Sequence, residues 1–174
     1  MVKNEEGFTL VELLIAVSIF AMLSVIISGI YLAFSKSQAR TKVSQSLLND
    51  AQYILETVAK EIKNNEIVEI ETFGNEDVYT LKKENGDLVA FEYDLGNLLS
   101  YGYDVDSEGW WIDLNDVDDF KITYFNIYLN SDNLDEDEQP RVTISLRVDK
   151  TSTVAYEKVF YNLQTTVSSR IYKR

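Results

Sequence analysis

The sequence predicts an α+β protein in which one long N-terminal helix packs on an antiparallel β-sheet head. Residues 13–34 contain no charged side chain. In residues 36–65 the apolar residues recur at steps of three and four, which is the pattern of a helix with one apolar face. From residue 66 onward, short runs rich in Val, Ile, Thr, Tyr and Phe follow one another without helical patterns between them, which favours antiparallel pairing.

The uncharged stretch predicts a membrane-spanning helix. Residues 13–34 number 22, and about 20 apolar residues are enough to cross the hydrocarbon layer as a helix. A cleaved secretory signal has a shorter apolar core of roughly 7 to 15 residues with a small-residue cleavage site after it, and no such site follows here. A buried core helix and an ordinary signal peptide are the alternatives.

One carboxylate, Glu12, stands at the start of this stretch. A carboxylate in a membrane costs about 2.5 to 3.5 kcal/mol at the helix centre and less near an end, so it usually has a partner. The nearest basic residues in the sequence are Lys3, upstream, and Lys36, beyond the whole span. Two interpretations are open: Glu12 lies at the interface and reaches headgroups or water, or it pairs with a positive group on another chain.

The stretch "GFTLVELLIAVSIFAML", residues 7–23, resembles the N-terminal signature of type IV pilins and of the pseudopilins of secretion and DNA-uptake machines. The signature combines a glycine, a phenylalanine, a hydroxyl residue, a glutamate at fixed spacing and a long apolar helix. The resemblance implies that a prepilin peptidase cuts between Gly7 and Phe8 on the cytoplasmic face and that the new Phe8 amine is N-methylated. It also implies that Glu12 meets the Phe8 amine of a neighbouring subunit during assembly.

The charges that flank the span conflict with the orientation that the resemblance implies. The leader, residues 1–7, has one lysine against two glutamates, whereas Lys36, Arg40 and Lys42 follow the span. The positive-inside rule alone would place the C-terminal bulk in the cytoplasm. A cytoplasmic cleavage site determines orientation more directly than three charges do. We therefore expect a single-pass protein of the cytoplasmic membrane with an extracytoplasmic head.

Small residues recur one helical turn apart within the span. Ser24 precedes Ser28, and Gly29 precedes Ala33, and such pairs let two helices approach closely. Small residues are also simply common in membrane helices, and the pattern does not separate the two explanations. Gly29 stands where many pilins have a helix-bending proline, and a glycine there costs about 1 kcal/mol of helix propensity.

The predicted helix continues past the span. A continuous helix over residues 8–64 would be roughly 85 Å long. The predicted organisation is a cleaved leader over residues 1–7, a membrane or fibre-core half over 8–35, an amphipathic half over 36–65 and a β-rich head over 66–174. The apolar stripe of the amphipathic half consists of Val43, Leu47, Ala51, Ile54, Leu55, Val58 and Ile62.

The head is predicted to be one antiparallel sheet with the amphipathic half of the helix over one face. Asn85 and Gly86 lie between two candidate strands and predict a hairpin. The candidate strands are residues 66–71, 77–83, 88–94, 110–114, 120–129, 141–148 and 155–163.

Composition excludes several functions. The chain has 16 basic and 29 acidic residues, a net charge of −13, which argues against a phosphate-binding surface, so no direct nucleic acid binding is expected. It has no histidine and no cysteine, which excludes a Ser-His-Asp triad, a cysteine nucleophile, a typical zinc site and a disulfide. We expect no enzymatic activity.

Calcium is the one cofactor that the sequence suggests. Asp104, Asp106 and Glu108 alternate before Gly109, as in the first half of a calcium loop. The twelfth position, where such a loop needs a bidentate glutamate, is Asn115. Several pseudopilins bind calcium in loops, and the alternative is a plain solvated loop. A second acidic tract contains Asp132, Asp135, Asp137 and Glu138.

The function that the resemblance implies is that of a minor pilin or pseudopilin, a structural subunit of a motility pilus, a type II secretion pseudopilus or a competence pilus. The ending "LQTTVSSR", residues 163–170, resembles that of the larger pseudopilins. The expected partners are the prepilin peptidase and methyltransferase, other pilin or pseudopilin subunits, the inner-membrane assembly platform and membrane lipid. The alternatives are a single-pass membrane-anchored binding or sensory domain and a soluble enzyme exported by a signal.

Overall fold

The structure is a computed structural model, and contacts divide the chain into two compact units. The first unit is Met1–Thr41 and the second is Lys42–Arg174, and each is described by itself. The residues that the structure describes are 7–73, 76–94, 96–103, 110–129 and 141–168.

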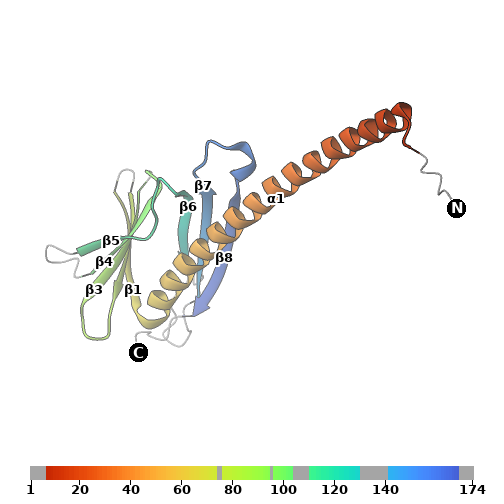
Figure 1. The fold of residues 1–174 in the computed structure, drawn as a ribbon. Helices are drawn as coiled ribbons and strands as arrows, with labels where there is room; N and C mark the ends of the chain where they lie inside the picture. The colour runs from red at the N-terminus through yellow and green to blue at the C-terminus, as the bar shows by residue number, and fades with distance from the viewer. Residues whose placement is uncertain (1–6, 74–75, 95, 104–109, 130–140, 169–174) are drawn as a thin grey trace. The chain divides into compact units, whose positions relative to one another are not determined.

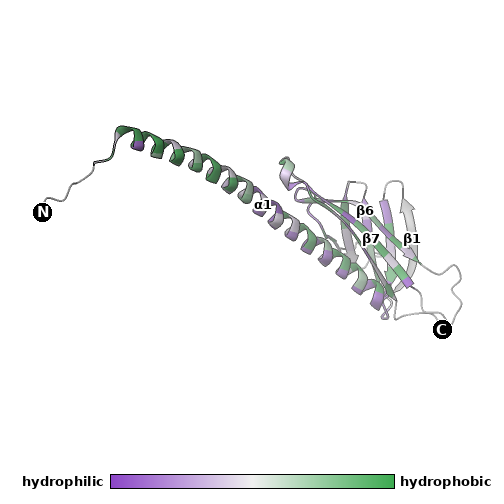
Figure 2. Cartoon of the chain, turned by 90° about the vertical axis from the view of Figure 1, so that its right-hand side faces the viewer, coloured by the Kyte–Doolittle hydropathy of each residue, from purple (hydrophilic) through white to green (hydrophobic). Residues whose placement is uncertain are grey.

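The long helix predicted from the sequence is confirmed as α1, Leu10–Asn64. Its apolar and polar residues are distributed as expected: the N-terminal half is predominantly hydrophobic, and the second half alternates between hydrophobic and hydrophilic residues (Figure 2). At the C-terminal end, Lys63 provides the positive charge that favours a helix terminus. Asn65 follows, and its backbone N–H donates to the Glu61 carbonyl at 3.0 Å while its amide donates to the Glu61 carboxylate at 2.9 Å.

The head contains two antiparallel sheets (Figure 1). Within each sheet the strands lie side by side in the order of the sequence, so each connection inside a sheet joins two adjacent strands. The five-stranded sheet consists of β1 Glu66–Phe73, β2 Glu76–Lys82, β3 Leu88–Asp94, β4 Leu98–Tyr103 and β5 Trp110–Asp113. The three-stranded sheet consists of β6 Phe120–Leu129, β7 Arg141–Lys150 and β8 Phe160–Ser168, with a short 3-10 helix, η1 Ala155–Glu157, before β8.

One hydrophobic core lies between α1 and the two sheets. Strand alternation directs one face of each sheet into it, as Val89 and Phe91 of β3 and Ile144 and Leu146 of β7 show. The predicted helical stripe is confirmed, because five of its members are fully buried in this core: Leu47, Ala51, Ile54, Val58 and Ile62. The amphipathic half of α1 is therefore held by packing, which is the usual source of helical stability in proteins.

The predicted hairpin at Asn85 and Gly86 is confirmed and connects β2 to β3. The Gly86 N–H donates to the Lys83 carbonyl at 3.0 Å, and the Lys83 N–H donates to the Asp87 carbonyl at 2.9 Å. Gly86 has a φ of 96°, a left-handed conformation that suits glycine. This five-residue connection differs from the two-residue loop that an Asn-Gly pair most often forms.

Three features of the head differ from the sequence prediction. The predicted α+β class, with the helix packed on an antiparallel head, is confirmed, but the strands form two sheets where one was predicted, and β4, Leu98–Tyr103, was missed. The last strand begins at Phe160, since Ala155–Glu157 form a 3-10 turn.

Buried Asn115 lies where the chain leaves one sheet, after β5, and enters the other. Its carbonyl accepts from the Leu99 N–H at 2.8 Å, and its amide donates to the Asn97 carbonyl at 3.0 Å and the Phe120 carbonyl at 3.2 Å. These three bonds connect Asn115 to backbone groups at the starts of β4 and β6, where the Asn97 carbonyl also accepts from the Ile122 N–H at 3.2 Å.

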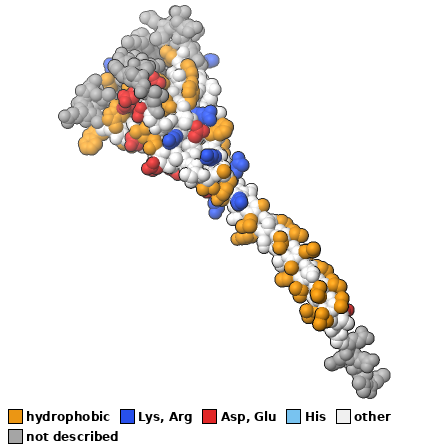
Figure 3. All heavy atoms as spheres, turned by 90° about the horizontal axis from the view of Figure 1, so that it is seen from above, with side chains coloured by type: hydrophobic (Ala, Val, Ile, Leu, Met, Phe, Trp, Pro, Cys, Tyr) orange, Lys and Arg blue, Asp and Glu red, His pale blue; other side chains and the backbone are white. Residues whose placement is uncertain are grey.

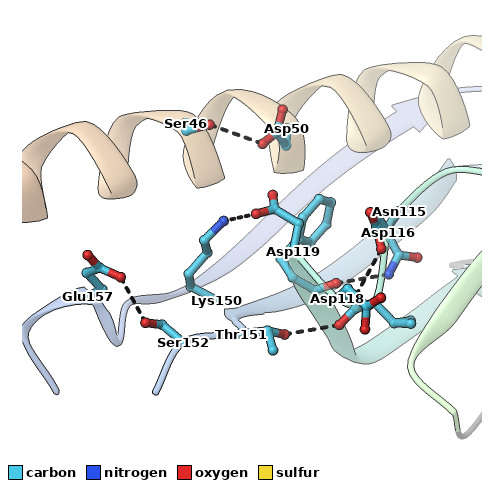
Figure 4. Close-up of polar contacts among 12 residues, drawn as sticks. Ser46, Asp50, Asn115, Asp116, Asp118, Asp119, Lys150, Thr151, Ser152 and Glu157 are labelled. Carbon is cyan, nitrogen blue, oxygen red and sulfur yellow. Dashed lines mark hydrogen bonds and ion pairs between the residues drawn. The ribbon is translucent and has the colours of Figure 1, made fainter. Parts of the chain in front are cut away.

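Polar contacts also attach the turn before β6 to the segment after β7 (Figure 4). Lys150 forms an ion pair with Asp119, and the Thr151 hydroxyl donates to the Val117 carbonyl at 3.1 Å. The Asp118 N–H donates to the Asp116 carboxylate at 2.9 Å, which closes an Asx-type turn. The carboxylates of Asp116 and Asp119 therefore have structural roles in this turn.

Candidate processing and assembly site

The predicted processing site lies immediately before α1. Gly7, Phe8 and Thr9 have no regular secondary structure, and the helix begins at Leu10. The Thr9 carbonyl accepts the first helical hydrogen bond, from the Leu13 N–H at 3.2 Å, so Thr9 is the N-cap residue.

Thr9 and Glu12 form a reciprocal capping box. The Glu12 N–H donates to the Thr9 hydroxyl oxygen at 3.3 Å. In return, the Thr9 N–H and the Thr9 hydroxyl each donate to Oε2 of Glu12 at 2.9 Å. A helix start leaves backbone N–H groups without helical partners, and this arrangement satisfies two of the N–H groups there.

The sequence places no basic residue close to Glu12, but the structure gives its carboxylate a neutral partner in its own chain. The partner is Thr9, three residues away, and its donors are a neutral amide and a neutral hydroxyl. The sequence contains the signal, because Thr-x-x-Glu before an apolar run is the capping-box pattern. Neutral donors orient the Glu12 carboxylate but leave its negative charge uncompensated, so the predicted charge pairing with another chain remains a prediction.

No described part of the chain covers the peptide bond between Gly7 and Phe8. A Cβ built on Gly7 would meet no atom within 4 Å, and the Phe8 side chain is 84% exposed. The bond lies two residues before the start of an ordered helix. An enzyme that binds this segment would meet no described part of the chain in its way.

After Glu12, the apolar side chains of the first unit have no cover. Every large apolar side chain from Leu10 to Phe34 is more than half exposed. In Figure 3, orange hydrophobic side chains cover the visible face of this part of the helix. Among the described residues, α1 is the one helix long and apolar enough to cross a membrane. Such a surface requires lipid or other helices around it.

The predicted small-residue positions fall within this apolar part, and their polar groups are satisfied internally. The Ser24 hydroxyl donates to the Phe20 carbonyl at 2.8 Å, and the Ser28 hydroxyl donates to the Ser24 carbonyl at 2.7 Å. A Cβ on Gly29 would meet no atom within 4 Å. The helix therefore presents no unsatisfied hydroxyl here, and the packing role of Ser24, Ser28, Gly29 and Ala33 remains a prediction.

The predicted calcium ligands, Asp104, Asp106 and Glu108, lie outside the described residues, as does the second acidic tract. Within the described ranges, no group of three or more Asp, Glu, His or Cys residues is placed to hold a metal ion. Asn115 uses its side chain on backbone groups, as described above. Calcium binding remains a prediction.

One protein-family model matches the chain. Residues 2–28 match the family described as "Prokaryotic N-terminal methylation motif". The match includes Gly7, Phe8, Thr9 and Glu12, and it supports a type IV pilin-like protein with a structural role. No curated protein and no solved structure matches the chain.

Proposed function

We propose that this chain is a structural subunit of a type IV pilus-like fibre, cut by prepilin peptidase between Gly7 and Phe8 and then N-methylated at Phe8. One observation carries the proposal: the methylation motif coincides with an open Gly7–Phe8 bond directly before a capped helix whose first half is apolar and uncovered. The methylation motif alone would support cleavage and methylation of the chain. The exposed helix adds a surface that lipid or the helices of other subunits must cover.

The exposed apolar helix must be covered both in the membrane and in the fibre. Burial of one large apolar side chain contributes about 1.5 to 3 kcal/mol, so this surface is stable only when it is covered. Lipid covers it in the membrane. In a fibre the apolar helices of other subunits replace the lipid, and the proposed packing positions around Gly29 allow close approach.

We further propose that the subunit is a minor pilin or pseudopilin, with its head outside the cytoplasmic membrane before it joins the fibre. The orientation is supported by the motif, since prepilin peptidase acts at the cytoplasmic face. The minor role is supported by the head, in which two cysteine-free sheets enclose one core. The fibre is a motility pilus, a secretion pseudopilus or a competence pilus, and its assembly platform is the further partner.

The N-terminus of the protein recovered from membranes tests this function. Mass spectrometry is expected to find N-methylphenylalanine at Phe8. Gly7→Val is expected to leave full-length precursor, because the peptidase needs close approach to a residue without a Cβ. The matched control is Gly29→Ala, which adds a side chain to another glycine with open surroundings, within α1, and should leave cleavage intact. An intact, unmethylated N-terminus on the wild-type protein would favour the membrane-anchored domain instead.

A further inference from the structure

The outer face of the five-stranded sheet carries an excess of carboxylates. On β2 to β5, the residues that alternate with the buried ones point away from the core. Among the described side chains, these outward-pointing residues include four acids and one lysine. We call this surface the acidic face. Its charged residues are Glu76, Lys82, Glu92, Asp94 and Asp113.

The acids of the acidic face repel one another. Glu76 and Asp94 are direct partners in the β2–β3 ladder, an arrangement that destabilises a sheet. The pKa of Glu92 is raised above its ordinary value, first by partial burial and then by the negative charges of Glu76 and Asp94. Neither of the salt bridges found among the described residues involves this face. The sheet thus carries a local cost that a positively charged partner would relieve.

The outer face of the three-stranded sheet has the opposite charge. Its charged residues are Lys121 on β6 and Arg141, Arg147 and Asp149 on β7, three bases against one acid. We call this surface the basic face. Asp149 contacts Arg147 at 3.4 Å and accepts from the Thr123 hydroxyl at 2.6 Å. Lys121 and Arg141 are exposed and take part in neither salt bridge.

The basic face also has the residue types of a binding surface. The Arg147 guanidinium lies 4.8 Å from the centre of the Phe160 ring, and the hydroxyls of Tyr124 and Tyr128 are 2.6 Å apart. Arginine and aromatic residues are enriched at protein interfaces. A hollow of about 680 Å³ lies over this face, and its lining includes Tyr124, Arg147 and Gln164.

We propose that the basic face of one copy of this chain binds the acidic face of a second copy. Charge complementarity carries the proposal: the acidic face has a net charge of −3, from four acids and one base, and the basic face has +2, from three bases and one acid. Both sheets direct their other faces into one core, so both charged faces point away from it. Each copy thus presents one face of each sign to its neighbours.

This contact is heterologous, because two different faces meet. Such contacts build open chains when the rotation does not close a ring. The inference deepens the proposed function and rests on it, since an open chain of copies is what a fibre requires. The three-stranded face measures roughly 450 Å² from ordinary strand dimensions, below the roughly 800 Å² per partner of a stable complex. The contact therefore forms between subunits that a membrane or fibre already holds close together.

Ionic strength alone does not test the contact. Each chain carries a net charge of −13, so salt weakens the overall repulsion between copies as well as the attraction between the two faces. Reversal of charge on one face, with rescue by reversal on the other, separates the two effects. Only direct apposition of the faces predicts rescue.

The chain has no cysteine, so introduced cysteines give a clean cross-linking assay in membranes and fibres that contain the full chain. Gln164→Cys marks the basic face, and Thr80→Cys marks the acidic face. A flexible bis-maleimide is expected to join the two variants when they are co-expressed. Adding Lys121→Glu and Arg141→Glu to the first variant should lower this product about tenfold, because like charges then face each other.

Rescue and a matched control complete the test. Glu76→Lys with Glu92→Lys on the Thr80→Cys copy should restore the product to within about twofold of the original level. Lys42→Glu with Lys60→Glu makes the same change of charge on exposed helix positions and should leave the product unchanged. Loss of the cross-linked product in this control would overturn the inference. So would a loss of product on charge reversal of the basic face that reversal of the acidic face does not rescue. Cross-linking of the basic face only to an unrelated anionic partner would overturn it as well.

The same samples separate this inference from the proposed function. Suppose that the protein is cut before Phe8 and is present in fibres, but the Gln164→Cys and Thr80→Cys variants give no cross-linked product. That result would overturn the proposed contact and leave the proposed function intact. Protein that keeps its leader and stays out of fibres contradicts the function. In that second case a cross-linked product would still support the paired faces.

Discussion

Thr9 donates both its backbone N–H and its hydroxyl to one carboxylate oxygen of Glu12, each at 2.9 Å. Glu12 is therefore part of the start of its own helix as well as the proposed partner of another chain. The two roles use different properties of the side chain. Helix capping needs hydrogen-bond acceptors, whereas pairing with an amine needs charge, so variants can separate them.

Thr9 variants test the cap. Thr9→Val keeps the shape of the side chain but removes the hydroxyl, and loss of an N-cap typically costs about 1 kcal/mol. Amide hydrogen exchange in the first turn, measured on the full chain in micelles, is expected to rise about fivefold. Thr9→Ser keeps the hydroxyl and should exchange as the wild type does. Equal exchange in the Val variant would show that the helix start does not depend on this cap.

Glu12 variants test the charge. Glutamine also forms capping boxes, so Glu12→Gln is expected to keep the cap while it deletes the charge. Glu12→Ala loses both. Both variants should insert, fold and be cut at Gly7, and both should be depleted from sheared fibres relative to membranes. Incorporation of the Gln variant at the wild-type level would show that charge pairing does not recruit this subunit.

Glu92 gives a pH-dependent prediction. Because its pKa is raised in the folded state, folding favours the protonated form, and stability is lost as the pH rises from the ordinary value near 4.5 through the raised one. At pH 7, Glu92→Gln should stabilise the head by about 0.5 kcal/mol, through removal of a like charge from the acidic face. Below pH 4 the gain should vanish. Chemical unfolding at both pH values measures it, and a gain that persists at low pH would exclude repulsion as its cause.

Gly102 makes room for the Trp111 ring on the acidic face. Gly102 and Trp111 are ladder partners, and a Cβ on Gly102 would lie 2.9 Å from the indole ring. Gly102→Ala should displace the indole, destabilise the head by about 1 to 3 kcal/mol and change tryptophan fluorescence. Gly96→Ala is the comparison, since its close neighbour is the Asp94 carboxylate, the far end of a movable side chain. Unchanged fluorescence in Gly102→Ala would mean that the ring has another position.

Calcium binding at Asp104, Asp106 and Glu108 is tested by thermal melts of the full chain with millimolar calcium and with chelator. A bound ion stabilises the folded state in proportion to the logarithm of its concentration above Kd. If the loop binds, the midpoint rises with calcium and Asp106→Asn reduces the rise. Equal midpoints in calcium and chelator would remove calcium as a cofactor.

The sequence by itself determined the long helix, its division into a fully apolar and an amphipathic half, and the processing motif. These are local properties. Each signal lies within a short, continuous stretch of sequence: the hydrophobic period, the run of uncharged residues, and the spacing of Gly7, Phe8 and Glu12. The stripe from Leu47 to Ile62 was predictable for the same reason, since one side of a helix is defined by its own spacing.

Tertiary structure decided the division of the head into two sheets and the charge of their outer faces. β4 was missed because Gly102 and the tyrosines of "LLSYGY" give no clear alternation until Leu99 and Tyr101 are seen in the core. At the change of sheet, Asn115 forms three bonds to segments up to 18 residues away, and these partners cannot be read from its local sequence. The like charges of Glu76 and Asp94 are brought together only by strand register, and so are the bases of β6 and β7. A pairing between distant strands is not contained in either strand alone, which is why the acidic and basic faces emerge only in the folded head.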